Sequence, residues 1–181
     1  MKKIITLCVM SFLMTATHAQ KAQLLFYGVI EEAILRANDC GPVPIDGRSK
    51  VKAIDNVNVN VYVAGELVST STSKENGFYG VLLRTGASYE VVFEKDGYFS
   101  KTFVMNCKNL KHNIDGSALK CPMDIDLYKE VDNKELQAMT KKPYGMCSVA
   151  QNQLKWDKEA MTVNRKKFLE IARPIYQQNE K

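Results

Sequence analysis

Hydrophobic and polar residues alternate strictly between positions 56 and 63, and this segment sets the pattern for the first two thirds of the chain. Its four valines occupy every second position, so an extended backbone places all of them on one face. The opposite face carries mainly asparagine. A strand with a single apolar face is typical of an antiparallel sheet packed on a second sheet, whereas strands of a parallel sheet are buried on both faces.

Similar patterns, separated by turn signals, predict further strands. They lie at residues 23–30, 67–73, 78–84, 89–95, 98–106 and 123–128. The dipeptides Asn76-Gly77 and Asp96-Gly97 stand between neighbouring strands and favour tight hairpin turns, because both residue types tolerate positive φ. Short strands with regular turns predict a mainly β protein, a seven-stranded antiparallel Greek-key β-sandwich.

The last predicted strand alternates apolar residues with two carboxylates, Asp124 and Asp126. Both carboxylates are expected to face water. They share one face of the strand and could bind calcium, but the further oxygen ligands that calcium needs are not apparent nearby. We therefore predict a solvated strand face and no metal site.

Two segments depart from the strand pattern. Residues 31–55 form a long insertion after the first strand, in which Gly, Pro, Asn and Asp cluster and break regular structure. Residues 131–181 form a C-terminal extension with helical signals. The sandwich is therefore expected to span residues 20–130.

The extension is expected to contain a short helix and a longer one. Asp132 and Glu135 have the spacing of a capping box, and Pro143 would end the short helix. Asp157 can cap the longer helix, and Pro174 is expected to limit it. The apolar residues of that helix mostly share one stripe: Met161, Phe168, Ile171, Ala172 and Ile175. We expect the stripe to pack on the sandwich; the alternative is a basic amphipathic helix at a membrane surface.

Residues 1–19 have the features of a secretory signal peptide. Lys2 and Lys3 form a basic start, residues 4–14 are apolar, and the sequence Thr17-His18-Ala19 offers a cleavage site. The apolar run is shorter than the roughly 20 residues that a membrane-spanning helix needs. The protein is therefore expected to be exported, to the periplasm or outside the cell, and its mature chain to lack a transmembrane segment.

Removing this peptide lowers the formal charge from +5 to +3, because Lys2 and Lys3 leave with it, and lowers the number of cysteines from five to four. So small a charge, without a Lys/Arg cluster interleaved with aromatics, argues against binding to nucleic acid. Four cysteines in an exported chain indicate two disulfides. Strands that run alternately up and down would bring cysteines together in pairs. The predicted bridges are Cys107 with Cys121 and Cys40 with Cys147.

Several motifs together resemble a known family. They are Gly28-Val29, the valines of 57–63, Thr72 followed by Asn76-Gly77-Phe78, Gly86, residues 89–92, and Lys95-Asp96-Gly97-Tyr98 followed by Lys101. From Leu24 to Tyr128 the chain resembles the carboxypeptidase regulatory-like domain, a transthyretin-like (prealbumin-like) β-sandwich of exported and envelope proteins of Gram-negative bacteria. The resemblance implies an accessory module beside catalytic, transport or adhesive partners. The insertion that carries Cys40 departs from the family pattern.

Residues suited to catalysis are scarce in this sequence. The mature chain keeps a single histidine, His112, in a polar loop, and no serine stands in a Gly-x-Ser-x-Gly elbow. The cysteines lack the Cys-x-x-Cys spacing of a zinc site. A small hydrolase is therefore the least favoured function, and we expect no enzymatic activity and no cofactor.

The remaining functions are both binding functions. We expect a non-enzymatic exported binding or scaffolding module of the cell envelope, with an envelope protein as its partner. The alternative is a carbohydrate-binding module, because exposed aromatic rings can stack on sugars. The aromatic residues considered for such a site are Tyr62, Tyr79, Phe99 and Trp156. Exposed sheet edges would also allow pairing between copies, so the oligomeric state stays open.

Overall fold

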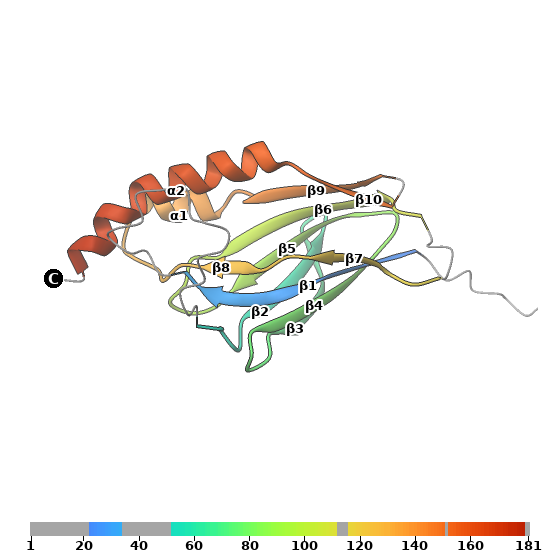
Figure 1. Ribbon diagram of the computed structural model, residues 1–181, viewed down its shortest axis with the longest axis horizontal. Coiled ribbons are helices and arrows are strands. Elements are labelled where there is room, and N and C mark those ends of the chain that lie inside the picture. The colour runs from blue at the N-terminus through green and yellow to red at the C-terminus, as the bar shows by residue number, and fades with distance from the viewer. Residues whose placement is uncertain (1–21, 34–51, 112–115, 151, 180–181) are drawn as a thin grey trace, which may run out of the picture.

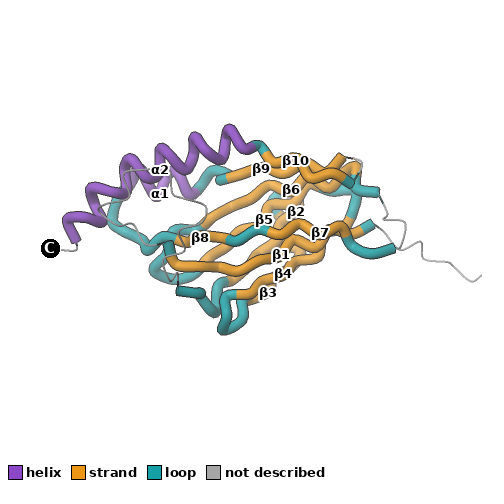
Figure 2. Tube along the Cα trace, in the orientation of Figure 1, coloured by secondary structure: helices purple, strands orange, loops and turns teal. Residues whose placement is uncertain are grey.

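The computed structural model describes residues 22–33, 52–111, 116–150 and 152–179. Within these ranges, two β-sheets pack on each other and two helices lie beside them, on the side where strand β9 runs (Figure 1). Figure 2 shows the strands grouped together and the helices along one margin. The predicted mainly β sandwich with a helical C-terminal extension is therefore confirmed.

The first sheet is built around the long N-terminal strand. Its strands are β1 (Gln23–Glu32), β4 (Phe78–Arg84), β7 (Leu119–Pro122) and β8 (Ile125–Leu127). Strand β1 pairs with β4 in antiparallel fashion and with both β7 and β8 in parallel fashion. The single strand predicted at 123–128 is thus two short strands, which follow β1 one after the other.

The second sheet contains the valine-rich strand and has the order β10-β9-β6-β5-β2-β3. Its strands are β2 (Asn58–Val63), β3 (Glu66–Thr72), β5 (Ser88–Glu94), β6 (Lys101–Asn109), β9 (Gly145–Ala150) and β10 (Gln153–Trp156). Strand β9 runs parallel to β6. The seventh predicted strand runs parallel to the first, as up-and-down alternation requires, but Cys147 lies in β9, a strand that was not predicted.

The core lies between the sheets, where the inward faces meet. Val57, Val59 and Val61 are buried, as their alternation predicts. Aromatic rings from both sheets meet edge to face beside them: the ring centroids of Tyr79 and Phe93 are 4.9 Å apart, and those of Phe26 and Tyr79 are 5.5 Å apart. Such edge-to-face pairs stabilise the core beyond the area that they bury.

Helix α1 (Lys134–Thr140) and helix α2 (Lys158–Asn179) form the extension. Asn133 caps α1, because its side-chain oxygen accepts hydrogen bonds from the backbone N–H of Glu135 and Leu136 at 3.0 Å. The predicted cap at Asp132 is therefore one residue early. Asp157 caps α2 as predicted, since its carboxylate accepts from Ala160 N at 2.9 Å.

The apolar stripe of α2 packs against the rest of the protein, as expected. Phe168 and Ala172 are buried in a second cluster with Phe99, Tyr128 and Leu136. Pro174 lies inside the helix, which continues to Asn179, so the expected limit at this proline is wrong. Among the described segments, no helix has both the length and the apolar character needed to cross a bilayer.

Three parts of the predicted organisation lie outside the described residues. They are the signal peptide at 1–19, most of the insertion at 31–55 with Cys40, and His112. The two ends of the insertion are described and lie side by side: Glu32 N donates to Lys52 O at 2.8 Å, and Ile54 N donates to Ile30 O at 2.9 Å. The insertion therefore leaves and rejoins the sandwich at one place.

Candidate functional site

A buried lysine marks the end of the core nearest the helices. Lys101 is the first residue of β6 and shares its inward face with Phe103, Met105 and Cys107. Only 9% of Lys101 is exposed, although lysine is rarely buried unless its charge is paired. The strand pattern thus places a cation where an apolar side chain would be expected.

The ammonium group of Lys101 is held by a carbonyl and two aromatic rings. Its Nζ donates to the main-chain oxygen of Asp126 at 2.6 Å and lies 4.2 Å from the ring centroid of Tyr144. The ring centroid of Tyr128 is 5.8 Å away. Cations over aromatic faces are attracted by the ring quadrupole, so these contacts offset part of the cost of burial.

Burial lowers the pKa of Lys101 to about 8, and the positive charge of Arg165 acts in the same direction. The nearby carboxylate of Asp126 opposes this shift. The lysine is therefore still mostly protonated at neutral pH, but it releases its proton far more readily than an exposed lysine.

A cavity of about 220 Å³ opens beside Lys101, between the sandwich and the two helices. Its apolar lining comes mainly from Phe99, Tyr128, Met139, Pro143 and Phe168. Its polar lining includes Lys101, Thr102, Asp126, Tyr144 and Asn164. An apolar cavity of roughly 150 Å³ can hold a benzene molecule, so this one can accept a large side chain or a small ligand.

The walls of the cavity are fixed by contacts between distant parts of the chain. Asn164 of α2 donates from Nδ2 to Tyr144 O at 3.0 Å, and Tyr144 N donates to Thr102 O at 2.8 Å. The ring of Phe168 lies 4.7 Å from that of Tyr128 and 5.7 Å from that of Phe99, measured between centroids. The cavity therefore exists only while α2 is docked.

Charged side chains surround the opening of the cavity. Lys142, Lys167 and Glu135 also line it, and Lys167 Nζ lies 3.9 Å from the Glu135 carboxylate. This ion pair is well exposed and contributes little to stability. The arrangement offers cationic groups at both the inner end and the rim of an otherwise mostly apolar cavity.

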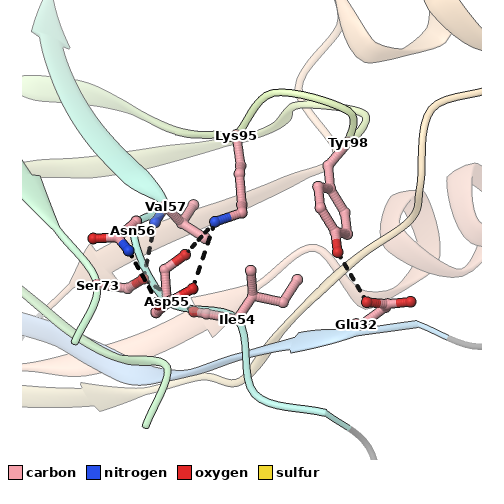
Figure 3. Close-up of polar contacts among 8 residues, drawn as sticks. All are labelled: Glu32, Ile54, Asp55, Asn56, Val57, Ser73, Lys95 and Tyr98. Carbon is pink, nitrogen blue, oxygen red and sulfur yellow. Dashed lines mark hydrogen bonds and ion pairs between the residues drawn. The ribbon is translucent and has the colours of Figure 1, made fainter. Parts of the chain in front are cut away.

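A neighbouring polar cluster closes the same end of the sandwich (Figure 3). Lys95 Nζ donates to the main-chain oxygen of Asp55 at 2.6 Å, and Ser73 Oγ donates to Ile54 O at 3.0 Å while accepting from Val57 N. The Lys95 contact joins the segment that follows the insertion to the turn between β5 and β6, and the Ser73 contacts join it to the end of β3. We assign the cluster a structural role, because its polar groups are satisfied by one another.

Tyr98 and Glu32 complete this cluster. The Tyr98 hydroxyl donates to the Glu32 carboxylate at 2.8 Å, and Lys129 Nζ lies 3.1 Å from the same carboxylate. Burial raises the pKa of Glu32, but the hydrogen bonds from Tyr98 and Lys129 outweigh it, so the pKa is lowered. Burial and the bond to Glu32 raise the pKa of Tyr98 to about 12.

The aromatic residues proposed for sugar binding do not form an exposed strip. Tyr79 and Phe99 are buried, and Tyr62 and Trp156 are half-buried. Trp156 packs into the core, with its ring centroid 6.1 Å from that of Phe103. Tyr79 and Trp156 belong to the core and Phe99 to the helix interface, where it also lines the cavity, whereas Tyr62 belongs to neither cluster. A sugar-binding role for these residues stays a prediction.

The two carboxylates of the seventh predicted strand differ in their surroundings. Asp124 is exposed and accepts a hydrogen bond from Val29 N at 3.0 Å. Asp126 is half-buried beside Lys101, so the expectation that it faces water is wrong. Among the described residues, no group of histidine, cysteine and acidic side chains has the arrangement of a metal site.

The three described cysteines are Cys107, Cys121 and Cys147, and all are buried free thiols in this structure. The bridge predicted between Cys107 and Cys121 is therefore not formed here. Cys147 lies inside β9, directly opposite Met105 of β6, rather than in a loop beyond the last strand. The predicted bridge from Cys147 to Cys40 lies partly outside the described residues.

Comparisons with known proteins give little beyond this geometry. No family model matches the chain, and no curated protein matches it. Solved structures with some likeness include 3-chlorocatechol 1,2-dioxygenase from Rhodococcus opacus, at 12% identity and a TM-score of 0.39, covering 62% of either chain. A second is the shaft pilin SpaA from Lactobacillus rhamnosus, at 13% identity and a TM-score of 0.39, with a match that covers 61% of this chain and 52% of the pilin. A third is a cohesin–X-dockerin complex from Acetivibrio cellulolyticus, at 14% identity and a TM-score of 0.31, with a match that covers 59% of this chain and 58% of that chain. This chain spans less than two thirds of each of these chains, and no activity follows from so distant a likeness.

Proposed function

We propose that the protein is a non-enzymatic exported binding module of the cell envelope, and that the cavity beside Lys101 holds a segment of a partner protein. The sandwich carries the motifs that resemble the prealbumin-like, carboxypeptidase regulatory-like domain, whose members serve as accessory modules. The observation that carries the proposal is the cavity itself, with a buried cation at its inner end and apolar walls.

The lining indicates what kind of segment would bind. Phe99, Met139 and Phe168 supply apolar surface for one large side chain, whose burial would contribute roughly 1.5–3 kcal/mol. Lys101, Lys142 and Lys167 supply ammonium groups for a carboxylate. An apolar side chain next to an acidic residue, or next to a C-terminal carboxylate, satisfies both parts of the lining.

The described residues also support a binding role over a catalytic one. They contain no histidine, since both histidines lie outside the described ranges. Ser100 and Thr102 line the cavity and carry hydroxyl groups. The nearby Asp126 carboxylate interacts with the charge of Lys101, whose ammonium group donates a hydrogen bond to the Asp126 carbonyl. Among the contacts of the described residues, Lys101 Nζ is not bonded to the hydroxyl of Ser100 or Thr102, so no bonded pair of nucleophile and base stands at the cavity.

The test is an affinity pull-down from an envelope extract of the source cells. Wild type is compared with Ala138→Trp, which places an indole at an exposed position of the cavity lining. The matched control is Val163→Trp, on an exposed surface of α2 outside the cavity. We expect a specific envelope protein to be captured by wild type and the control, with at least about a tenfold loss for Ala138→Trp.

Two results would contradict the proposal. Equal capture of the partner by Ala138→Trp would place the binding surface elsewhere. Capture of a polysaccharide instead of a protein, with release of the polysaccharide when free sugar is added, would favour the carbohydrate alternative. Lys101→Met adds a sharper readout, because a partner held through a carboxylate should bind this variant more weakly and with less dependence on salt.

A further inference from the structure

The topology brings two cysteines from opposite sheets to one place in the core. Cys121 of β7 lies opposite Phe26 of β1 in the first sheet. Cys147 of β9 lies opposite Trp156 of β10 in the second sheet. The rings of Phe26 and Trp156 meet across the core with centroids 6.3 Å apart, so the two cysteines flank one inter-sheet contact.

The two thiols lie in the same buried cluster of the core. Cys121 and Cys147 are both almost completely buried, and each perturbs the pKa of the other. The interaction raises the pKa of Cys121 and lowers that of Cys147. Thiols that perturb each other in this way lie close together, which a disulfide requires.

We propose that Cys121 and Cys147 form a disulfide that joins the two sheets. The oxidant is a small or protein disulfide, such as glutathione disulfide. The Cys147 thiolate attacks one sulfur of the oxidant and releases one thiol, which gives a mixed disulfide. The Cys121 thiolate then attacks the Cys147 sulfur and releases the second thiol. The protein thus loses two electrons and two protons, which reduce the oxidant to two thiols.

Cys107 is the third thiol of this cluster and the residue first predicted to pair with Cys121. It lies on β6, in the same sheet as Cys147, and burial raises its pKa to about 12. Among the influences on the pKa of Cys121, that of Cys147 is the largest and that of Cys107 the smallest. Either pair would join the two sheets, and the structure favours Cys147 over Cys107 as the partner of Cys121.

Burial determines when the bridge forms. Because Cys121 and Cys147 are closed off from solvent, an oxidant reaches them before the sheets pack or when they open locally. Formation in the cell rests on the proposed export to an oxidising compartment. Formation during refolding does not depend on export, which keeps the two proposals separable.

The test maps the disulfide by peptide analysis without reduction. The full chain without its signal peptide is unfolded with reductant, refolded in a glutathione redox buffer, alkylated and digested with trypsin. Lys108, Lys120 and Lys129 separate the cysteines into different peptides. We expect the Cys121 peptide to be linked to the Cys147 peptide, and the same link to form in Cys107→Ser.

A link between the Cys107 and Cys121 peptides would overturn the proposal, as would full alkylation of Cys121 and Cys147 after refolding. The protein isolated from the exporting cell gives the second measurement. If refolding forms the bridge while the isolated protein carries free thiols, the pairing is supported and the proposed export is contradicted.

Discussion

Lys101 is both part of the inward face of β6 and part of the lining of the candidate site. Its aliphatic stem continues the inward face of β6, while its ammonium group reaches a carbonyl and two rings at the end of the core. A methionine would fill the same space without the cost of a buried charge. Retaining a lysine here thus lowers stability, and in the proposed function it provides a cation for the partner.

The pH dependence of stability tests this assignment. The folded-state pKa of Lys101, about 8, lies below the value near 10.5 of an unfolded lysine. Below pH 8 both states carry the proton and the cost of burying the charge is fully present. Between pH 8 and 10.5 only the unfolded state keeps the proton, so stability rises with pH, by up to about 3 kcal/mol.

The measurement is urea unfolding of wild type and Lys101→Met from pH 7 to 10.5. We expect wild type to gain stability relative to Lys101→Met as the pH rises, and Lys120→Met, an exposed strand position, to behave like wild type. Thiols and tyrosines titrate in all three proteins, so they cancel in the differences. A constant difference between wild type and Lys101→Met would show that Lys101 keeps an ordinary pKa.

Gly28 is required by a close approach between two backbones. A Cβ at this position would lie 1.9 Å from the carbonyl oxygen of Met123, where the chain passes from β7 to β8 along β1. Gly28→Ala should therefore push this segment off β1 and lower the free energy of unfolding by about 3 kcal/mol.

Gly80→Ala is the matched control for this change. Gly80 lies on β4, and the nearest atom to a Cβ there is 3.8 Å away. Because alanine is also less costly than glycine in a strand, the control should be neutral or slightly more stable. Thermal unfolding of both variants checks this, and equal midpoints would contradict the close approach at Gly28.

At the scale of elements, local patterns predicted the strands of the sandwich and failed for the elements that depend on neighbours. Strand β4 has the predicted bounds, and β1 and β5 differ from prediction by one or two residues at their ends. Strand β9 was missed, because Gly, Met, Cys, Ser and Ala do not favour strands on their own. It becomes a strand because β6 offers it an open edge to pair with.

Helix α2 provides the next prediction, because one aromatic residue holds it against the sandwich. Phe168 is buried and contacts the rings of Phe99 and Tyr128. Phe168→Ala should lower the free energy of unfolding by about 3 kcal/mol and speed hydrogen exchange along the helix. Val163→Ala, at a residue that is 59% exposed on the same helix, should change stability by less than about 0.5 kcal/mol.

The measurement is hydrogen exchange followed by mass spectrometry, together with denaturant unfolding. Slow exchange along α2 in Phe168→Ala would contradict the docked arrangement. It would also reopen the alternative in which the apolar stripe serves another surface, such as a membrane.

At the scale of the whole molecule, the candidate site could not be found from the sequence. Lys101 entered only as one residue of a family resemblance, and its burial depends on α1, α2 and the segment before β9. The sequence did carry one indication of this site, because Lys101 stands at a position where the alternation of Phe99, Phe103 and Met105 calls for a buried apolar residue. It could not show that helices from the far end of the chain would cover it, because such contacts are not local.

The same contacts predict that sandwich and helices unfold together. Met161 of α2 packs on the core over Gly145, and Asn164 is bonded to the segment that precedes β9. Trp156 is the single tryptophan of the chain and contacts rings of both sheets, two residues before α2 begins. Its fluorescence therefore reports the sandwich, while circular dichroism at 222 nm reports chiefly the helices.

We expect both signals to change with the same denaturant midpoint in wild type, because undocking α2 would expose Phe168, Ala172 and the apolar lining of the cavity to water. In Phe168→Ala the helical signal should be lost first, since the helices then lose their main contact with the sandwich. Separate transitions in wild type would mean that α1 and α2 form an independent unit. The cavity beside Lys101 would then be open in part of the folded population, and a partner would have to bind by closing it.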